Sequence, residues 1–191
     1  MRFTGLIVGA LAVAGLAGVA STALAARHGP ANAPRSAATT LAPLSDAEIA
    51  TLRWMREEEK LARDMYITLN TFFPAKVFTN IAASEQKHFD AIGRKLDLYG
   101  LEDPAVDQVG VFTDPRLQQL YADLLAQGMV NYVEALKVGV IIEEADLTDL
   151  ELAIDGTDSV PLTRTYEHLL TGSEHHLAAF TRLLAKAGVS L

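Results

Sequence analysis

A glutamate and a histidine three residues apart have the types and spacing best suited to chemistry in this sequence. Glu85 and His88 lie within residues 79–99, whose apolar side chains recur at helical spacing. At about 100° per residue, both side chains fall on the apolar face of the predicted helix. That face consists of Ile81, Ile92, Leu96 and Tyr99. A carboxylate and an imidazole directed at a helical core are the donor types that bind divalent metals.

Three further segments of helical periodicity carry ionisable side chains on or beside their apolar faces. These additional candidate ligands are Glu58, Glu59, Glu143, Glu144 and His176. Glu143 completes the apolar spacing of its segment, Glu144 lies at the edge of that face, and His176 lies on the flank of its own. Other ionisable residues nearby are predicted to be solvated or to cap helix ends: Arg56, Glu57, Asp146, Asp149, His168 and His175.

The cost of burying several carboxylates decides how this pattern is interpreted. An unpaired buried carboxylate costs several kcal/mol, and carboxylates placed together repel one another. Two histidines cannot neutralise so many, whereas a divalent cation can, because carboxylate oxygens and imidazole nitrogens are its natural ligands. One glutamate–histidine pair would be a weak indication by itself. Four helices with the same chemistry predict a buried metal site.

Helix boundaries follow from capping residues and helix breakers. Ser45 and Glu48 have the spacing of a capping box, and Pro74 ends the helix that they begin. The predicted helices are residues 45–73, 79–99, 115–127, 130–154 and 161–187. No segment shows strand-like alternation of any length. Short connections within each pair of long helices, and a long one between the pairs, predict an all-α antiparallel four-helix bundle whose crossover carries the short helix.

The stretches EKLARDMY, SEQKH, IEEADLTDL and HHLAAF, in this order, resemble the ferritin-like superfamily with rubrerythrin-type spacing. The resemblance covers residues 45–187 and is greatest to an exported bacterial branch whose function is not established. It implies a ferritin-like bundle that binds two iron ions, with manganese as the alternative metal. It favours Glu59 over Glu58, because Ala62 and Tyr66 follow Glu59 at the expected distances. The implied ligands are Glu59 and Glu143 as terminal ligands, Glu85 as a bridge, and His88 and His176 as nitrogen ligands.

One position departs from the pattern of that superfamily. A glutamate is expected three residues before His176, where this sequence has Ser173. Glu174 is a poor substitute, because it lies roughly 160° around the helix from His176. Either the site holds a single ion, or another carboxylate fills the place, the candidates being Glu58, Glu144 and Asp146.

Length, charge and cysteine content narrow the classes of function. The chain has 191 residues, a formal net charge of −8 and no cysteine. The negative charge argues against nucleic-acid binding, which requires a surface rich in lysine and arginine. Without cysteine, any metal must be bound by histidine and carboxylate side chains.

Residues 1–25 are organised like a cleaved secretory signal peptide. Arg2 precedes an uncharged run that ends in Ala23-Leu24-Ala25, the small-x-small pattern of a signal-peptidase site. Residues 26–44 are predicted to be a flexible linker to a domain of residues 45–188. We therefore expect a periplasmic or extracellular protein without a stable membrane anchor. An uncleaved anchor is the alternative, since the apolar run is about long enough to span a bilayer.

Three functional hypotheses follow. The first is a non-haem iron redox protein, similar to a ferroxidase or peroxidase, that oxidises Fe(II) with oxygen or peroxide. The second is a metal-binding module that stores or senses metal without turnover. The third is a metal-free structural bundle whose buried carboxylates pair with Arg53, Arg63 or Arg94.

Overall fold

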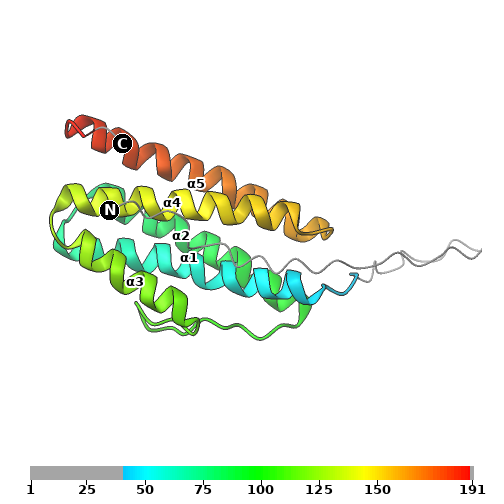
Figure 1. Cartoon of the computed structure of the whole chain (residues 1–191). Helices are drawn as coiled ribbons and strands as arrows, with labels where there is room; N and C mark the ends of the chain where they lie inside the picture. Colours follow the sequence, from blue (N-terminus) through cyan, green and yellow to red (C-terminus); the bar gives the residue numbers. More distant parts are fainter. Residues whose placement is uncertain (1–40, 190–191) are drawn as a thin grey trace, which may run out of the picture. The chain divides into compact units, whose positions relative to one another are not determined.

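The computed structural model describes residues 41–189, which form five helices and no strand (Figure 1). The helices are α1 (Asp46–Phe72), α2 (Lys76–Tyr99), α3 (Pro115–Gly128), α4 (Tyr132–Asp155) and α5 (Val160–Lys186). The all-α class predicted from the sequence is thus confirmed for this part of the chain. The predicted signal peptide, and all but the end of the predicted linker, lie outside the described residues. Across residues 41–189, no helix combines the length and the hydropathy that a bilayer crossing requires.

The helix ends depend on local side-chain contacts, most of which the sequence indicates. The Ser45 N–H donates to the Glu48 carboxylate (2.8 Å), and the Glu48 N–H donates to the Ser45 hydroxyl (3.2 Å), which completes the predicted capping box. At the other end of its helix pair, α2 stops at Gly100, whose φ of 65° is left-handed. The start of α2 at Lys76 is three residues earlier than predicted. There the Asn70 side chain accepts the N–H of Ala75 (3.0 Å) and closes the turn, while Ala75 gives α2 no side-chain cap.

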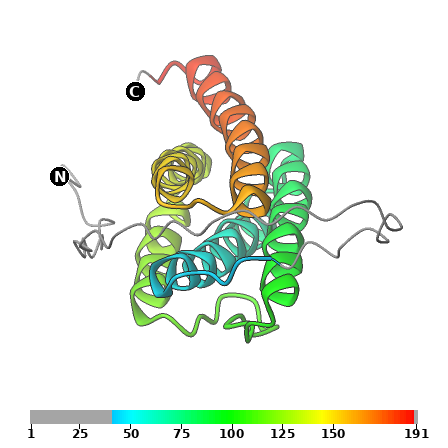
Figure 2. The same ribbon diagram turned by 90° about the vertical axis from the view of Figure 1, so that its right-hand side faces the viewer.

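The long helices pack in two pairs, α1 with α2 and α4 with α5. The pairs meet through contacts of α1 with α4 and of α2 with α5, while α3 lies against α1 and α4 (Figures 1 and 2). Buried apolar side chains form two clusters. One draws mainly on residues 61–69, 78–82, 135–142 and 180–184. The other draws on residues 52–55, 92–96, 150–153 and 162–169. In each long helix, the predicted ligand residues lie between the segments that supply these two clusters.

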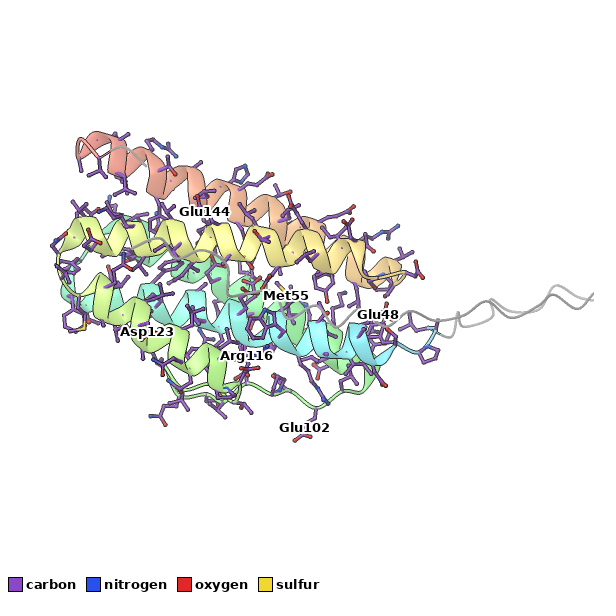
Figure 3. The ribbon with its side chains drawn as sticks, viewed as in Figure 1. Glu48, Met55, Glu102, Arg116, Asp123 and Glu144 are labelled. Atoms are coloured by element: carbon purple, nitrogen blue, oxygen red, sulfur yellow. The ribbon has the colours of Figure 1, made fainter. Side chains whose placement is uncertain are left out.

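The connection from α2 to α3 covers one face of α1, and this overturns the prediction that Arg56 and Glu57 are solvated. Arg56 is 8% exposed and Glu57 is 3% exposed. The Arg56 guanidinium pairs with Asp103 (2.7 Å). Glu57 accepts the backbone N–H groups of Thr113 (2.6 Å) and Asp114 (2.9 Å). The periodicity of α1 gives no indication of this cover, because the covering residues are about fifty positions away in sequence. By contrast, Glu102 in the same connection points outward (Figure 3).

Deeper beneath this connection lies a fully buried ion pair. The Lys60 ammonium group donates to Asp64 (2.6 Å) and to the carbonyls of Gln108 (2.8 Å) and Val111 (2.9 Å). Arg63 donates to Asp64 as well (2.9 Å). We call the five charged residues of α1 under the connection the connection layer: Arg56, Glu57, Lys60, Arg63 and Asp64. Together with the helices on its other side, this cover leaves all residues of α1 from 55 to 66 buried.

Candidate metal centre

Five ionisable residues meet between the two apolar clusters, and we call them the central cluster. They are Glu59 from α1, Glu85 and His88 from α2, Glu143 from α4, and His176 from α5. Each is less than 9% exposed, and the three glutamates are each 1% exposed. Because each of these residues occupies a core-facing position of its helix, the four helices bring the groups together without any loop residue.

Glu85 lies at the middle of the central cluster and faces both histidines. Its Oε2 atom is 2.8 Å from Nδ1 of His88, which is also 3.3 Å from Oε2 of Glu59. Its Oε1 atom is 2.6 Å from Nδ1 of His176, which is also 3.4 Å from Oε2 of Glu143. The result is two trios with one shared member, and the donor atoms of each trio lie within 4.8 Å of one another.

Five nitrogen and oxygen atoms of these trios have no hydrogen-bond partner despite the short distances. The buried atoms without a partner include Oε1 of Glu59, both carboxylate oxygens of Glu85, and Nδ1 of both histidines. The angles at the short nitrogen–oxygen contacts are therefore not those of hydrogen bonds. Buried polar groups in folded proteins are nearly always hydrogen-bonded. Donor atoms that converge without hydrogen bonds fit a metal ion, which would satisfy them all at once.

Burial and mutual proximity shift the pKa values within the central cluster in opposite directions. Burial raises the pKa of Glu59 to about 8 and that of Glu143 to about 7. Burial alone would also raise the pKa of Glu85, but the two adjacent histidines lower it to about 2. For His88, burial favours the neutral ring, yet Glu59 and Glu85 raise its pKa to about 10. Without metal, one carboxylate is thus ionised between two charged imidazoles, and the outer two carry protons up to neutral pH.

Asp146 is buried beside the central cluster, which overturns the prediction that it faces water or caps its helix. It is 5% exposed, and burial followed by repulsion from Glu59 holds its pKa well above the usual range. Ser173, which is fully buried, donates its hydroxyl to Oδ2 of Asp146 (2.5 Å), and Oδ1 has no partner. The serine that stands where the superfamily pattern has a glutamate therefore contacts a carboxylate of the facing helix. The helical period places Ser173 on the apolar face of α5 and Asp146 at the edge of that of α4, but it does not indicate which residue each one contacts.

The remaining predicted ligands differ in their burial. Glu58 is 5% exposed with a buried Oε2 atom that has no partner, and burial followed by the nearby charge of Asp149 raises its pKa. Asp149 is half-buried and accepts the indole N–H of Trp54 (2.9 Å). Glu144 is exposed and belongs to neither trio (Figure 3). The predicted exposure of the two other histidines of α5 is confirmed, since His168 and His175 are both exposed.

Tyr66 contacts the central cluster directly. Its hydroxyl donates to Oε1 of Glu143 (2.5 Å), and its ring packs against Phe78 and Phe180. This hydrogen bond leaves Oε2 of Glu143 to face His176. The sequence places Tyr66 about two turns beyond Glu59 and so permits either packing or this contact; the structure has both.

Among residues 41–189, the arginines proposed for a metal-free structural bundle do not pair with the carboxylates of the central cluster. Arg53 and Arg94 are exposed. Arg63 donates instead to Asp64 and to the side-chain carbonyl of Gln86 (2.9 Å). The carboxylates of the central cluster therefore have no arginine or lysine partner in the described part of the chain.

Comparison with known proteins places this chain in a family. A profile described as an uncharacterized protein domain (DUF2202) matches residues 48–191. The uncharacterized protein MJ0754 of Methanocaldococcus jannaschii is 45% identical over 147 residues, which cover 76% of this chain and 80% of that protein. A crystal structure of hypothetical protein MJ0754 from Methanococcus jannaschii DSM 2661 matches with a TM-score of 0.78 and 42% identity. The match covers 81% of this chain and 89% of the crystallised chain.

Proposed function

The chain belongs to the DUF2202 family, and we propose that this protein is a ferritin-like four-helix bundle with a two-metal carboxylate–histidine centre. Support comes from the pairing of α1 with α2 and of α4 with α5, joined by a long crossover that carries α3. In ferritin-like proteins, side chains from four facing helices bind the metals inside the bundle. Here, four helices likewise supply donors to one buried centre.

The observation that carries the proposal is the pair of donor trios that share Glu85. One ion would be bound by Glu59, Glu85 and His88, and the other by Glu85, Glu143 and His176. Hard carboxylate oxygens combined with imidazole nitrogens suit iron, with manganese as the alternative. Asp146, with its free buried oxygen, is the carboxylate best placed to stand in for the glutamate that Ser173 replaces.

Bound iron would supply redox chemistry in which Fe(II) is oxidised by oxygen or peroxide. The protein's own residues have separate roles around it. Glu85 presents one oxygen to each site, and Tyr66 fixes the rotation of the Glu143 carboxylate. The two apolar clusters, on either side of the donors, exclude bulk water from them. Metal binding displaces protons from Glu59, Glu143 and both imidazoles, so it is expected to tighten as the pH rises.

Metal analysis of protein purified without a histidine tag tests this function. We expect two iron or manganese ions per chain after anaerobic loading and dialysis, and aerobic oxidation of added Fe(II) faster than in buffer. Glu144→Ala is the matched control, because it removes an exposed carboxylate from α4 and should leave the metal content unchanged. Two bound ions without faster Fe(II) oxidation would favour storage or sensing over catalysis. A protein that binds no metal in this assay would refute the proposal.

We also propose that the protein is exported, with cleavage after Ala25 or Ala26. The support is the order of Arg2, an apolar run and an Ala-x-Ala site in residues 1–25. Mass spectrometry of the protein from its native cell should find Ala26 or Arg27 at the N-terminus in a soluble exported fraction. Intact Met1 in a membrane fraction would instead support the uncleaved anchor.

A further inference from the structure

Gly172 on α5 leaves room for the ring of His88. A Cβ atom at position 172 would lie 2.5 Å from Nε2 of His88 and 2.6 Å from its Cε1 atom. Side-chain carbons do not approach other atoms this closely, so any residue except glycine would force the imidazole to move. The backbone of Gly172 does not have the positive φ that favours glycine, and glycine weakens a helix interior. Space for the ring is therefore the role that the structure gives this residue.

The His88 ring is bounded on three sides. Its Nδ1 atom faces Glu85 and Glu59 at 2.8 and 3.3 Å. Its face lies against the ring of His176, with 5.5 Å between centroids and 29° between the ring planes. Its Nε2–Cε1 edge lies against the backbone of α5 at Gly172. Because Nδ1 and Nε2 are on opposite sides of Cε1, the position of this edge determines where Nδ1 points.

We infer that Gly172 is a positioning residue for metal binding, which acts by letting the His88 ring lie against α5 with Nδ1 directed at Glu59 and Glu85. That a metal binds here rests on the proposed function. That Gly172 positions the ring of His88 rests on the distances around Gly172. It distinguishes the two trios, since Gly172 abuts the ring of His88 in one trio and no ring of the other. A larger residue at position 172 therefore disables the Glu59–Glu85–His88 trio first.

Titration with Co(II), whose visible spectrum reports its ligands, tests this role. Gly172→Ala should weaken one of the two Co(II)-binding steps, the one at the trio with His88, by about 10- to 100-fold. This is the range seen when groups that orient ligands are lost. The spectrum should also show one histidine ligand fewer. Gly93→Ala is the matched control, because it also adds a methyl group to a crowded helix interior, but against the guanidinium of Arg56 in the connection layer (2.9 Å to Nη1) and not against the central cluster. The control should change the affinity less than twofold.

A double-mutant cycle separates positioning from general damage to the fold. If Gly172 acts through His88, then adding Gly172→Ala to His88→Ala should change Co(II) affinity less than twofold. A tenfold further loss in that background, or wild-type affinity in Gly172→Ala alone, would overturn the inference. Should Gly172→Ala fail to fold, the His88→Ala/Gly172→Ala variant must recover a cooperative thermal transition, because the clashing ring is gone; failure to recover also overturns it.

The failure of this inference can be distinguished from failure of the proposed function. Wild-type protein that binds neither Co(II) nor Fe(II) refutes the metal centre. In that case the steric role of Gly172 is tested in metal-free protein. The orientation of the His88 ring is compared between the wild type and Gly172→Ala in crystal structures or by NMR. A ring that keeps its position in Gly172→Ala would show that Gly172 does not position it.

Discussion

The connection layer and the central cluster are both buried groups of charged residues, yet they differ in how their charges are satisfied. In the connection layer, every charged group has a partner: Lys60 pairs with Asp64, Arg56 with Asp103, and Glu57 accepts two backbone N–H groups. In the central cluster, both carboxylate oxygens of Glu85 and the Nδ1 atoms of both histidines have no hydrogen-bond partner, although Glu85 lies within 2.8 Å of each Nδ1. Burial of charge alone therefore does not mark a functional site. Convergent polar atoms without partners are what distinguish the candidate site, because a bound cation would satisfy them.

The largest expected effect concerns the shared ligand. Glu85→Ala removes the one residue common to both trios and should reduce the metal content from two ions per chain to almost none. Helicity should persist, since the residue lies between two intact apolar clusters. Elemental analysis after dialysis and far-UV circular dichroism measure the two properties. If Glu85→Ala retains as much metal as Glu144→Ala, the central cluster does not bind metal, and the contrast with the connection layer is lost.

In the connection layer we expect a loss of stability without a loss of metal affinity. Lys60→Met leaves Asp64 with Arg63 as its remaining cationic partner and removes the donor of two buried carbonyls, which should lower the free energy of unfolding by about 1–3 kcal/mol. Lys137→Met is the control, because it breaks a partly exposed pair with Glu134 worth about 0–1 kcal/mol. Urea denaturation measures both changes. The comparison breaks if Lys60→Met abolishes metal binding while the protein is still folded.

Two adjacent histidines of α5 sharpen the same comparison at single-residue level. His176 is 7% exposed and faces Glu85 and Glu143, whereas its neighbour His175 is exposed. His176→Ala should weaken iron binding at least about 10- to 100-fold. His175→Ala should be silent, since surface substitutions usually change stability by less than about 0.5 kcal/mol. Equal affinities in a titration of the two folded variants would contradict the assignment of His176 as a ligand.

The metal-free protein should be most stable in mild acid. The pKa of His88 is raised to about 10 and that of His176 to about 9, so the protonated forms of both histidines stabilise the fold. This contribution is complete below pH 6.5 and is lost as the pH rises through 9–10. The pKa values of Glu59 and Glu143 are raised to about 8 and about 7, so these two carboxyl groups also lower the stability of the fold as the pH rises above 4.5. Glu85, with its pKa lowered to about 2, stabilises the fold above pH 4.5 and loses this effect as the pH falls through 2.

Urea denaturation of metal-free protein between pH 3 and 10 measures this profile. The free energy of unfolding should peak at about pH 4.5 and decline toward pH 9. His88→Ala should flatten the decline, because it removes one of the titrating groups. A stability that rises from pH 6 to 9 in metal-free protein would contradict these shifts.

The sequence was sufficient for those parts of the molecule that depend on one helix at a time. The capping box at Ser45, the all-α class and the inward direction of Glu85 and His88 all follow from local spacing. All five implied ligands lie together in the central cluster, and whether they bind metal stays a prediction. The identification of Glu59 rather than Glu58 as a member of a trio required the resemblance as well as the helical period.

The features that the sequence did not indicate depend on contacts between distant segments. Arg56 and Glu57 are predicted to be solvated, but the connection covers them. Asp146 is predicted to face water or to cap its helix, but it contacts Ser173 of the facing helix. The sequence of α5 gives no reason for a glycine at position 172, because the side chain that needs the space, His88, belongs to α2. Helical periodicity describes one element, whereas these positions are determined by what packs against it.

The unbroken burial of residues 55–66 in α1 has a consequence for how the native state opens. An amide exchanges its hydrogen only after its helix is exposed, and α1 is enclosed by the connection on one side and by α2 and α4 on others. Its amides should therefore exchange only through global unfolding. The last turns of α5, where most residues from 181 to 187 are exposed, should exchange through local fraying. The slowest-exchanging helix would then be α1, which carries Glu59. The fastest-exchanging part of α5 lies beyond His176. Local opening of that part therefore leaves the donor atoms of the central cluster in place.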